Sequence, residues 1–91
     1  MTPTFLTLIQ MFQLEGMVAL GKMLNPGTNQ ITKNLDHARY IINILEVLDE
    51  KTANNLTDDE RRFLEQTLST LRLNFVEESQ RPSVANSGEL T

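Results

Sequence analysis

The chain has 91 residues and no cysteine, and its 12 acidic and 8 basic residues give a formal net charge of −4. This length fits one domain, and the lack of cysteine excludes disulfides and thiolate metal sites. The acidic balance argues against a dedicated nucleic-acid binder and against attraction to an anionic membrane surface. We therefore expect one small cytoplasmic domain with no nucleic-acid partner.

The first segment predicts a helix over residues 3–24, with Thr2 as its N-cap and Pro3 in its first turn. Its apolar residues form a broad core-facing stripe: Phe5, Leu8, Ile9, Phe12, Ala19, Leu20 and Met23. A second stripe on the far side consists of Met11, Leu14 and Val18. Four polar or charged side chains interrupt the segment, so we interpret it as a soluble helix without membrane insertion.

The Asn25-Pro26-Gly27-Thr28-Asn29 segment predicts a turn that ends this helix. Ile31 is the one large apolar side chain of the connector, and we expect it to pack onto the core. Asn34 is the predicted N-cap of a second helix over residues 35–51. The core-facing stripe of this helix contains Leu35, Ala38, Ile41, Ile42, Leu45 and Leu48. A second stripe contains Tyr40, Ile44 and Val47.

Thr57 and Glu60 form a predicted capping box for a third helix over residues 58–78. Its main apolar stripe consists of Leu64, Leu68, Leu71 and Phe75. Residues 79–91 are small and polar, and we expect them to form a disordered tail. Residues 1–78 are thus predicted to form a single helical domain.

These patterns predict an all-α fold, a three-helix antiparallel bundle or helical hairpin array. A lone bundle needs only one buried face per helix, yet the first two helices carry two apolar stripes each. We interpret the second stripes as a docking surface and expect homodimerisation to complete the bundle. The predicted interface residues are Met11, Leu14, Val18, Tyr40, Ile44 and Val47.

An ordered set of short segments also resembles a known family. The segments are Ala19-Leu20-Gly21, Asn25-Pro26, Leu35-Asp36-His37-Ala38, Leu45-Glu46-Val47-Leu48, Glu50-Lys51-Thr52, Asn55-Leu56-Thr57 and Leu71-Arg72-Leu73-Asn74-Phe75-Val76. Over residues 4–78 the chain resembles the bacterial proteins of domain of unknown function 1844. The resemblance implies a short all-helical bacterial protein and brings no activity or catalytic residue. Asn29 stands where the family has a glycine, which puts the turn geometry in doubt.

One stretch, Gly16 to Lys22, has the spacing of a phosphate-binding loop, Gly-x-x-x-x-Gly-Lys. Met23 occupies the position where such a loop needs Ser or Thr, and a helix runs through the segment where a strand should precede it. We interpret Gly16 instead as a site of close helix approach, within the bundle or across a dimer. Gly21 is interpreted in the same way.

No other residue pattern predicts catalysis or metal binding. His37 is the only histidine and is expected near Asp36 and Arg39 at the start of the second helix. Acid–base catalysis would need a pocket and an oriented partner, so we favour a surface role. Glu46, Asp49 and Glu50 are interpreted as a solvated face, with Glu46 paired to Arg39 or Lys51.

The sequence therefore favours a non-enzymatic protein-interaction or adaptor module that acts through apolar helix faces in a homodimer. A different protein partner would leave the same apolar pattern. The alternative function is a bundle that binds a small apolar or acyl ligand between its helices, although no convergent polar anchor for such a ligand is visible. No cofactor is expected.

Overall fold

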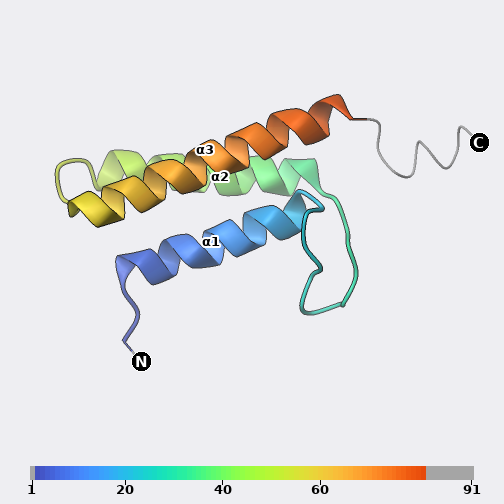
Figure 1. Ribbon diagram of the computed structural model, residues 1–91, viewed down its shortest axis with the longest axis horizontal. Coiled ribbons are helices and arrows are strands. Elements are labelled where there is room, and N and C mark those ends of the chain that lie inside the picture. Colours follow the sequence, from blue (N-terminus) through green and yellow to red (C-terminus); the bar gives the residue numbers. More distant parts are fainter. Residues whose placement is uncertain (1, 82–91) are drawn as a thin grey trace, which may run out of the picture.

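A computed structural model of the chain describes residues 2–81. In that range it contains three helices, α1 (Phe5–Ala19), α2 (Leu35–Lys51) and α3 (Asp58–Gln80). Helices that follow one another in sequence run antiparallel, and each helix packs against both others (Figure 1). The prediction of an all-α three-helix bundle is confirmed.

The start of α1 differs from the prediction, because Thr4 and not Thr2 is the N-cap. The Thr4 hydroxyl accepts a hydrogen bond from the Thr7 backbone N–H at 3.3 Å. In return, the Thr7 hydroxyl accepts one from the Thr4 backbone N–H at 3.1 Å. This reciprocal capping satisfies two backbone donors at once, and Pro3 therefore precedes the helix instead of lying in its first turn.

The end of α1 also differs, since the helix stops at Ala19 and not near Leu24. Gly21 adopts a left-handed backbone conformation, with φ of +79°. Its N–H donates to the Val18 carbonyl and the Lys22 N–H donates to the Met17 carbonyl, both at 3.0 Å. This pair of bonds is the Schellman arrangement, which glycine favours at the position after a helix cap. Gly21 is therefore a helix stop and not a helix-packing glycine.

The connector after α1 closes on itself through its own backbone. The Asn25 N–H donates to the Gln30 carbonyl at 2.8 Å, and the Asn29 N–H donates to the Asn25 carbonyl at 2.7 Å. Asn29 has a φ of +58°, a left-handed conformation that asparagine tolerates better than most residues. Because these bonds hold the turn, it needs no apolar anchor. The prediction that Ile31 packs onto the core is wrong: its side chain is 61% exposed.

The caps of the other two helices follow the sequence closely. The Asn34 side chain accepts from the His37 N–H at 3.1 Å, and the Thr57–Glu60 capping box is formed. The bounds of α2 agree with the prediction, whereas α3 continues two residues beyond residue 78, to Gln80. The expected tail therefore begins later than residue 79, and residues 82–91 lie outside the described part of the chain.

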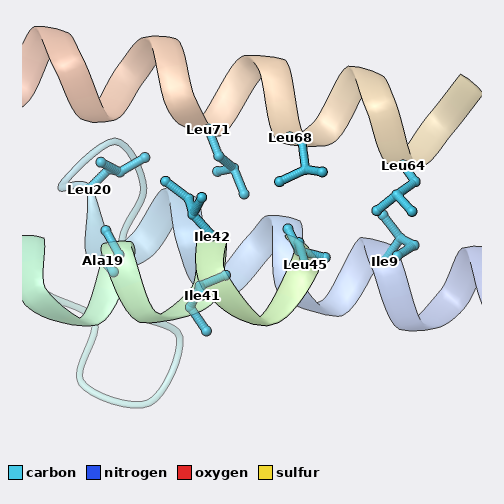
Figure 2. Close-up of a cluster of buried hydrophobic side chains, with 10 residues drawn as sticks. Ile9, Ala19, Leu20, Ile41, Ile42, Leu45, Leu64, Leu68 and Leu71 are labelled. Atoms are coloured by element: carbon cyan, nitrogen blue, oxygen red, sulfur yellow. The ribbon is translucent and has the colours of Figure 1, made fainter. Parts of the chain in front are cut away.

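The core lies along the common axis of the three helices, as Figure 2 shows. Its fully buried side chains come from every helix: Ile9, Leu20, Ile41, Leu45, Leu64 and Leu71. Burial of each such side chain favours folding by about 1.5–3 kcal/mol. Gly16 lies beside this cluster, where an added Cβ would be 2.9 Å from Leu71 Cδ2 and 3.5 Å from Ile41 Cγ2. The close approach that Gly16 permits is thus made within the bundle.

The left-handed Gly21 gives a direct test of the helix stop. We expect Gly21→Ala to lower the free energy of unfolding by about 1 kcal/mol, because a Cβ disfavours positive φ. The added Cβ would also lie 3.4 Å from Lys33 Cβ. Urea unfolding followed by circular dichroism measures the change, with Asn29→Gly as the control. That control places a glycine at a position that already has a left-handed backbone, so the free energy of unfolding should hardly change. An unchanged stability for Gly21→Ala would contradict the assignment of Gly21 as the helix stop.

Candidate interaction surface

The second stripe of α1 lies open on the molecular surface. Met11 is 63% exposed, Leu14 is 43% exposed and Val18 is half-buried. These three side chains line an open hollow of about 340 Å³ together with Glu15, Asn25 and Pro26. The connector turn thus forms one wall of the hollow, a feature that helical periodicity alone does not predict.

The second stripe of α2 divides between the surface and the core. Tyr40 is 60% exposed and Val47 is 54% exposed. Ile44 is half-buried and packs against the core cluster. Two of the three predicted interface side chains on α2 are therefore free to contact a partner, and the third offers only its outer edge.

A polar pair joins the two stripes across the α1–α2 boundary. Glu15, which lines the α1 hollow, lies with its Oε2 3.0 Å from His37 Nε2. The His37 ring in turn stacks on the Tyr40 ring, with centroids 6.2 Å apart and planes at 30°. The stripes of α1 and α2 therefore lie on one side of the molecule. We call the six side chains Met11, Leu14, Val18, Tyr40, Ile44 and Val47 the α1–α2 surface.

His37 has a different neighbour from those that the sequence suggested. Its partner is Glu15 of another helix, and not Asp36 or Arg39. Both side chains of the pair are about half exposed, at 42% for His37 and 53% for Glu15. A solvated pair of this kind links α1 to α2 at their outer edge, and its open setting lacks the enclosure that acid–base catalysis usually requires.

Glu46, one of the three carboxylates predicted to form a solvated face, pairs with a residue of another helix. Glu46 Oε2 lies 2.7 Å from Arg72 Nη2 of α3, so its predicted pairing with Arg39 or Lys51 is wrong. The Arg39 guanidinium instead lies 4.8 Å from the centroid of the Phe75 ring, in a cation–π contact. Within residues 2–81, no group of three His, Cys, Asp or Glu side chains is arranged to hold a metal ion.

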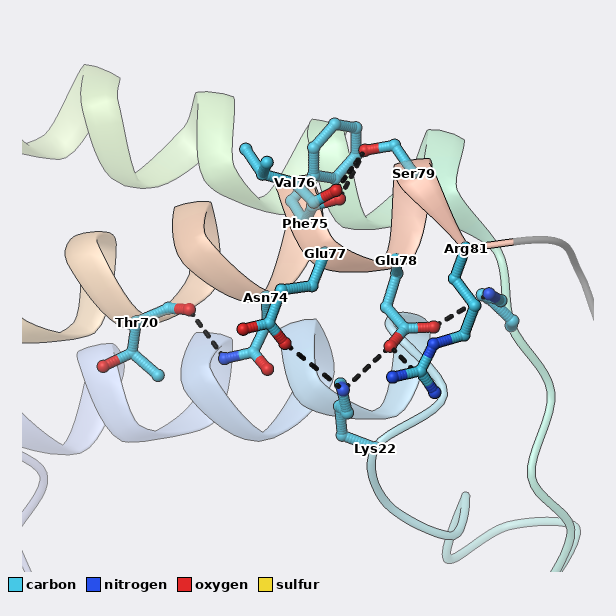
Figure 3. A network of polar contacts seen from close by, with 10 residues as sticks. Lys22, Thr70, Asn74, Phe75, Val76, Glu77, Glu78, Ser79 and Arg81 are labelled. Carbon is cyan, nitrogen blue, oxygen red and sulfur yellow. Dashed lines mark hydrogen bonds and ion pairs between the residues drawn. The ribbon is translucent and has the colours of Figure 1, made fainter.

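A buried ionic cluster at one end of the bundle was not predicted from the sequence. Glu78 of α3 is only 5% exposed, and its carboxylate lies 2.8 Å from both Lys22 Nζ and Lys33 Nζ. Arg81 Nη1 is 3.7 Å away, and Figure 3 shows Lys22 between Glu77 and Glu78. The lysine contacts, first of Lys22 and then of Lys33, outweigh burial and lower the pKa of Glu78 to about 2.

The helix stop at Gly21 places one of these lysines. It turns the chain so that Lys22 reaches α3, while the Asn34 N–H donates to the Ala19 carbonyl at 2.7 Å and holds the segment that carries Lys33. Lys22, the residue that would contact phosphate in a phosphate-binding loop, is thus paired with Glu78. The sequence did carry a signal, because Glu78 follows Leu64 and Leu71 at seven-residue steps and so occupies a core position.

The chain matches the model of a domain of unknown function (DUF1844) over residues 2–77. It belongs to this family. The resemblance seen in the sequence is confirmed, and the match to DUF1844 includes the whole α1–α2 surface, whereas Glu78 lies one position beyond it. No curated protein and no solved structure matches the chain. Within residues 2–81, the helices are too short or too polar to cross a membrane.

The low pKa of Glu78 makes the free energy of unfolding of the bundle depend on pH. In the unfolded chain this carboxyl has a pKa of about 4.3, against about 2 in the fold. Its stabilising contribution is therefore complete above about pH 4.3 and is lost as the pH falls toward 2. We expect wild type to lose about 2–3 kcal/mol more unfolding free energy than Glu78→Gln between pH 5 and pH 2.

Urea titrations at several pH values measure this difference. Glu77→Gln is the matched control, since Glu77 is exposed and lies 4.0 Å from Lys22, and it should follow the wild-type pH dependence closely. If Glu78→Gln showed the same pH dependence as wild type, protonation of Glu78 would not contribute to the stability of the fold.

Proposed function

We propose that this DUF1844 protein is a non-enzymatic interaction module whose α1–α2 surface binds a second copy of the same chain. The observation that supports this most directly is the exposure of Met11, Tyr40 and Val47, each more than half open to solvent. Large contiguous exposed apolar patches are uncommon on monomers and mark interaction sites. A homodimer would bury them on both chains. From the family resemblance and the cysteine-free sequence we further propose a bacterial, cytoplasmic setting.

The chemistry of the surface suits a protein partner. Methionine adapts to irregular contacts, and tyrosine is enriched where interfaces are most strongly bound. The polar Glu15–His37 pair lies between the stripes and supplies hydrogen-bonding groups within an otherwise apolar area. A few of these side chains should dominate the binding energy, with Met11 and Tyr40 foremost because they present the largest exposed apolar areas.

The alternative of an apolar or acyl ligand between the helices has less support. Large side chains from all three helices fill the space along the bundle axis, including Ile9, Leu45 and Leu64 at 0% exposure. The hollow beside Met11 is open to solvent instead of lying between helices. Thermal shift measurements with fatty acids of increasing length would test this alternative, and a rise in melting temperature that grows with chain length would favour it.

Self-association is tested by light scattering after size exclusion, from about micromolar to millimolar concentration, the range expected for a modest interface. We expect a mass of two chains at the higher concentrations. Leu14→Glu combined with Val18→Glu should shift the protein to monomer, because two carboxylates would be desolvated in the interface. The helical circular dichroism signal of that monomer should stay close to wild type.

Leu73→Glu provides the control, because Leu73 is 61% exposed on α3, away from the α1–α2 surface. It should leave the mass at two chains. A wild-type protein that remains monomeric throughout the concentration range would refute the homodimer, and unfolding of the double variant at low concentration would place Leu14 and Val18 in the core.

A further inference from the structure

Four exposed side chains on α2 form a row whose spacing is symmetric about the middle of the helix. Asp36, Tyr40, Val47 and Lys51 are spaced by four, seven and four residues. At 100° per residue these positions fall within a 60° sector of the helix, and all four are exposed. The row begins with an acid and ends with a base, with two apolar side chains between them.

The row has the same order of residue classes from either end, namely charged, apolar, apolar and charged, but its two end charges have opposite signs. Its midpoint lies between Asn43 and Ile44. If a second α2 helix runs antiparallel with the same midpoint, Asp36 faces Lys51 of the second copy and Tyr40 faces its Val47. The same two contacts recur at the other end, which is the property of a contact around a two-fold axis. A parallel pairing would set Asp36 against Asp36 and Lys51 against Lys51.

We propose that two copies of the chain pair through an antiparallel α2–α2 contact centred between Asn43 and Ile44. This inference rests on the proposed self-association and specifies its geometry. The contact extends over the full length of α2, about 22 Å from Asp36 to Lys51 at 1.5 Å per residue. It covers Tyr40 and Val47, the two most exposed apolar side chains of the helix.

The charges at the two ends of the row are available for this pairing. Within residues 2–81, neither Asp36 nor Lys51 has an ion-pair partner, whereas Glu15 and Glu46 each have one. Asp36 lies in the first turn of α2 and Lys51 in its last. Antiparallel pairing also brings the positive end of one helix dipole next to the negative end of the other.

The stripe on α1 fits the same arrangement. The Glu15–His37 contact fixes α1 along one flank of α2. A two-fold axis keeps this flank on the same side of the contact in both copies, so the two α1 helices lie on one side of the α2 pair. Met11 and Val18 of both copies are then brought toward the dimer contact instead of remaining on opposite faces. One contact geometry thereby accounts for both stripes.

Charge reversal tests the geometry. Asp36→Lys and Lys51→Glu, each alone, turn both end contacts of the dimer repulsive, and we expect each to raise the dimer Kd by about tenfold or more at low salt. An equimolar mixture of the two variants forms attractive pairs in the heterodimer, so dimer should return close to the wild-type level. Sedimentation equilibrium at about 50 mM and 500 mM salt should show the difference shrinking as screening increases.

Glu65→Lys is the matched control, because it makes the same change of charge at an exposed site on α3 and should leave the Kd unchanged. Circular dichroism checks that each variant keeps its helices. If wild type dimerises but the mixture does not recover, the antiparallel geometry is wrong while self-association stands. If wild type stays monomeric, both proposals fail.

Disulfide cross-linking tests the same geometry with a variant that leaves Asp36 and Lys51 both in place. The chain has no cysteine, so Asn43→Cys introduces a single thiol next to the proposed axis. We expect it to oxidise to a disulfide-linked dimer at least about tenfold faster than Asp36→Cys, whose two thiols would lie about 22 Å apart along the helices, too far to bond. Equal rates for the two variants, or faster linkage of Asp36→Cys, would overturn the proposal.

Discussion

The bundle depends on one close approach, at a residue without a side chain. Gly16 of α1 lies against Leu71 of α3, where an added Cβ would come within 2.9 Å of the Leu71 Cδ2 methyl, and beside Ile41 of α2, where it would make an ordinary contact at 3.5 Å. Glycine inside a helix costs about 1 kcal/mol relative to alanine, and here the cost is offset by the packing of two large side chains from two other helices. Because all three helices meet at this point, the position of each one sets the rotation of the others. The side of α1 and α2 that remains outward follows from it.

The end of the bundle is determined by a different kind of residue. A left-handed glycine stops α1 five residues before the apolar pattern ends, and the redirected chain carries Lys22 to a buried carboxylate of α3. Lys33, in the part of the connector that leads into α2, reaches the same carboxylate. The turn between them is held by its own backbone hydrogen bonds. Polar contacts thus close the end of a domain whose buried side chains, within residues 2–81, are otherwise almost all apolar, with Thr67 as the exception.

The sequence allowed the helices and their outward faces to be predicted where the signals are local. Asn34 and the Thr57–Glu60 pair are capping residues that can be recognised without knowing the fold, and the bounds of α2 followed directly. Periodicity likewise separated the exposed Met11 and Tyr40 from the core stripes. These features need only the geometry of a single helix.

The features that the sequence did not reveal depend on contacts between elements. Met23 and Leu24 continue the apolar stripe of α1, so periodicity alone cannot distinguish a helix-ending Gly21 from a helix-packing one. Glu78 was predicted only as the end of the third helix, because its lysine partners come from a connector whose path was unknown. The Glu15–His37 pair required the relative rotation of α1 and α2. Each of these is a property of the assembled bundle.

The ionic cluster also has a consequence for the order in which the chain acquires its structure during synthesis. Lys33 and Glu78 are 45 positions apart, so the connector cannot be held at that end until the last turns of α3 have been made. Leu71 imposes a similar delay on the packing at Gly16. The helical segments α1 and α2 are therefore made before α3, which supplies Leu64, Leu68 and Leu71 to the core, and the parts of their apolar faces that α3 covers remain accessible in the interval. Within residues 2–81, the core is complete only once α3 has been made and packed, so the third helix of the bundle decides when the apolar faces of α1 and α2 are covered.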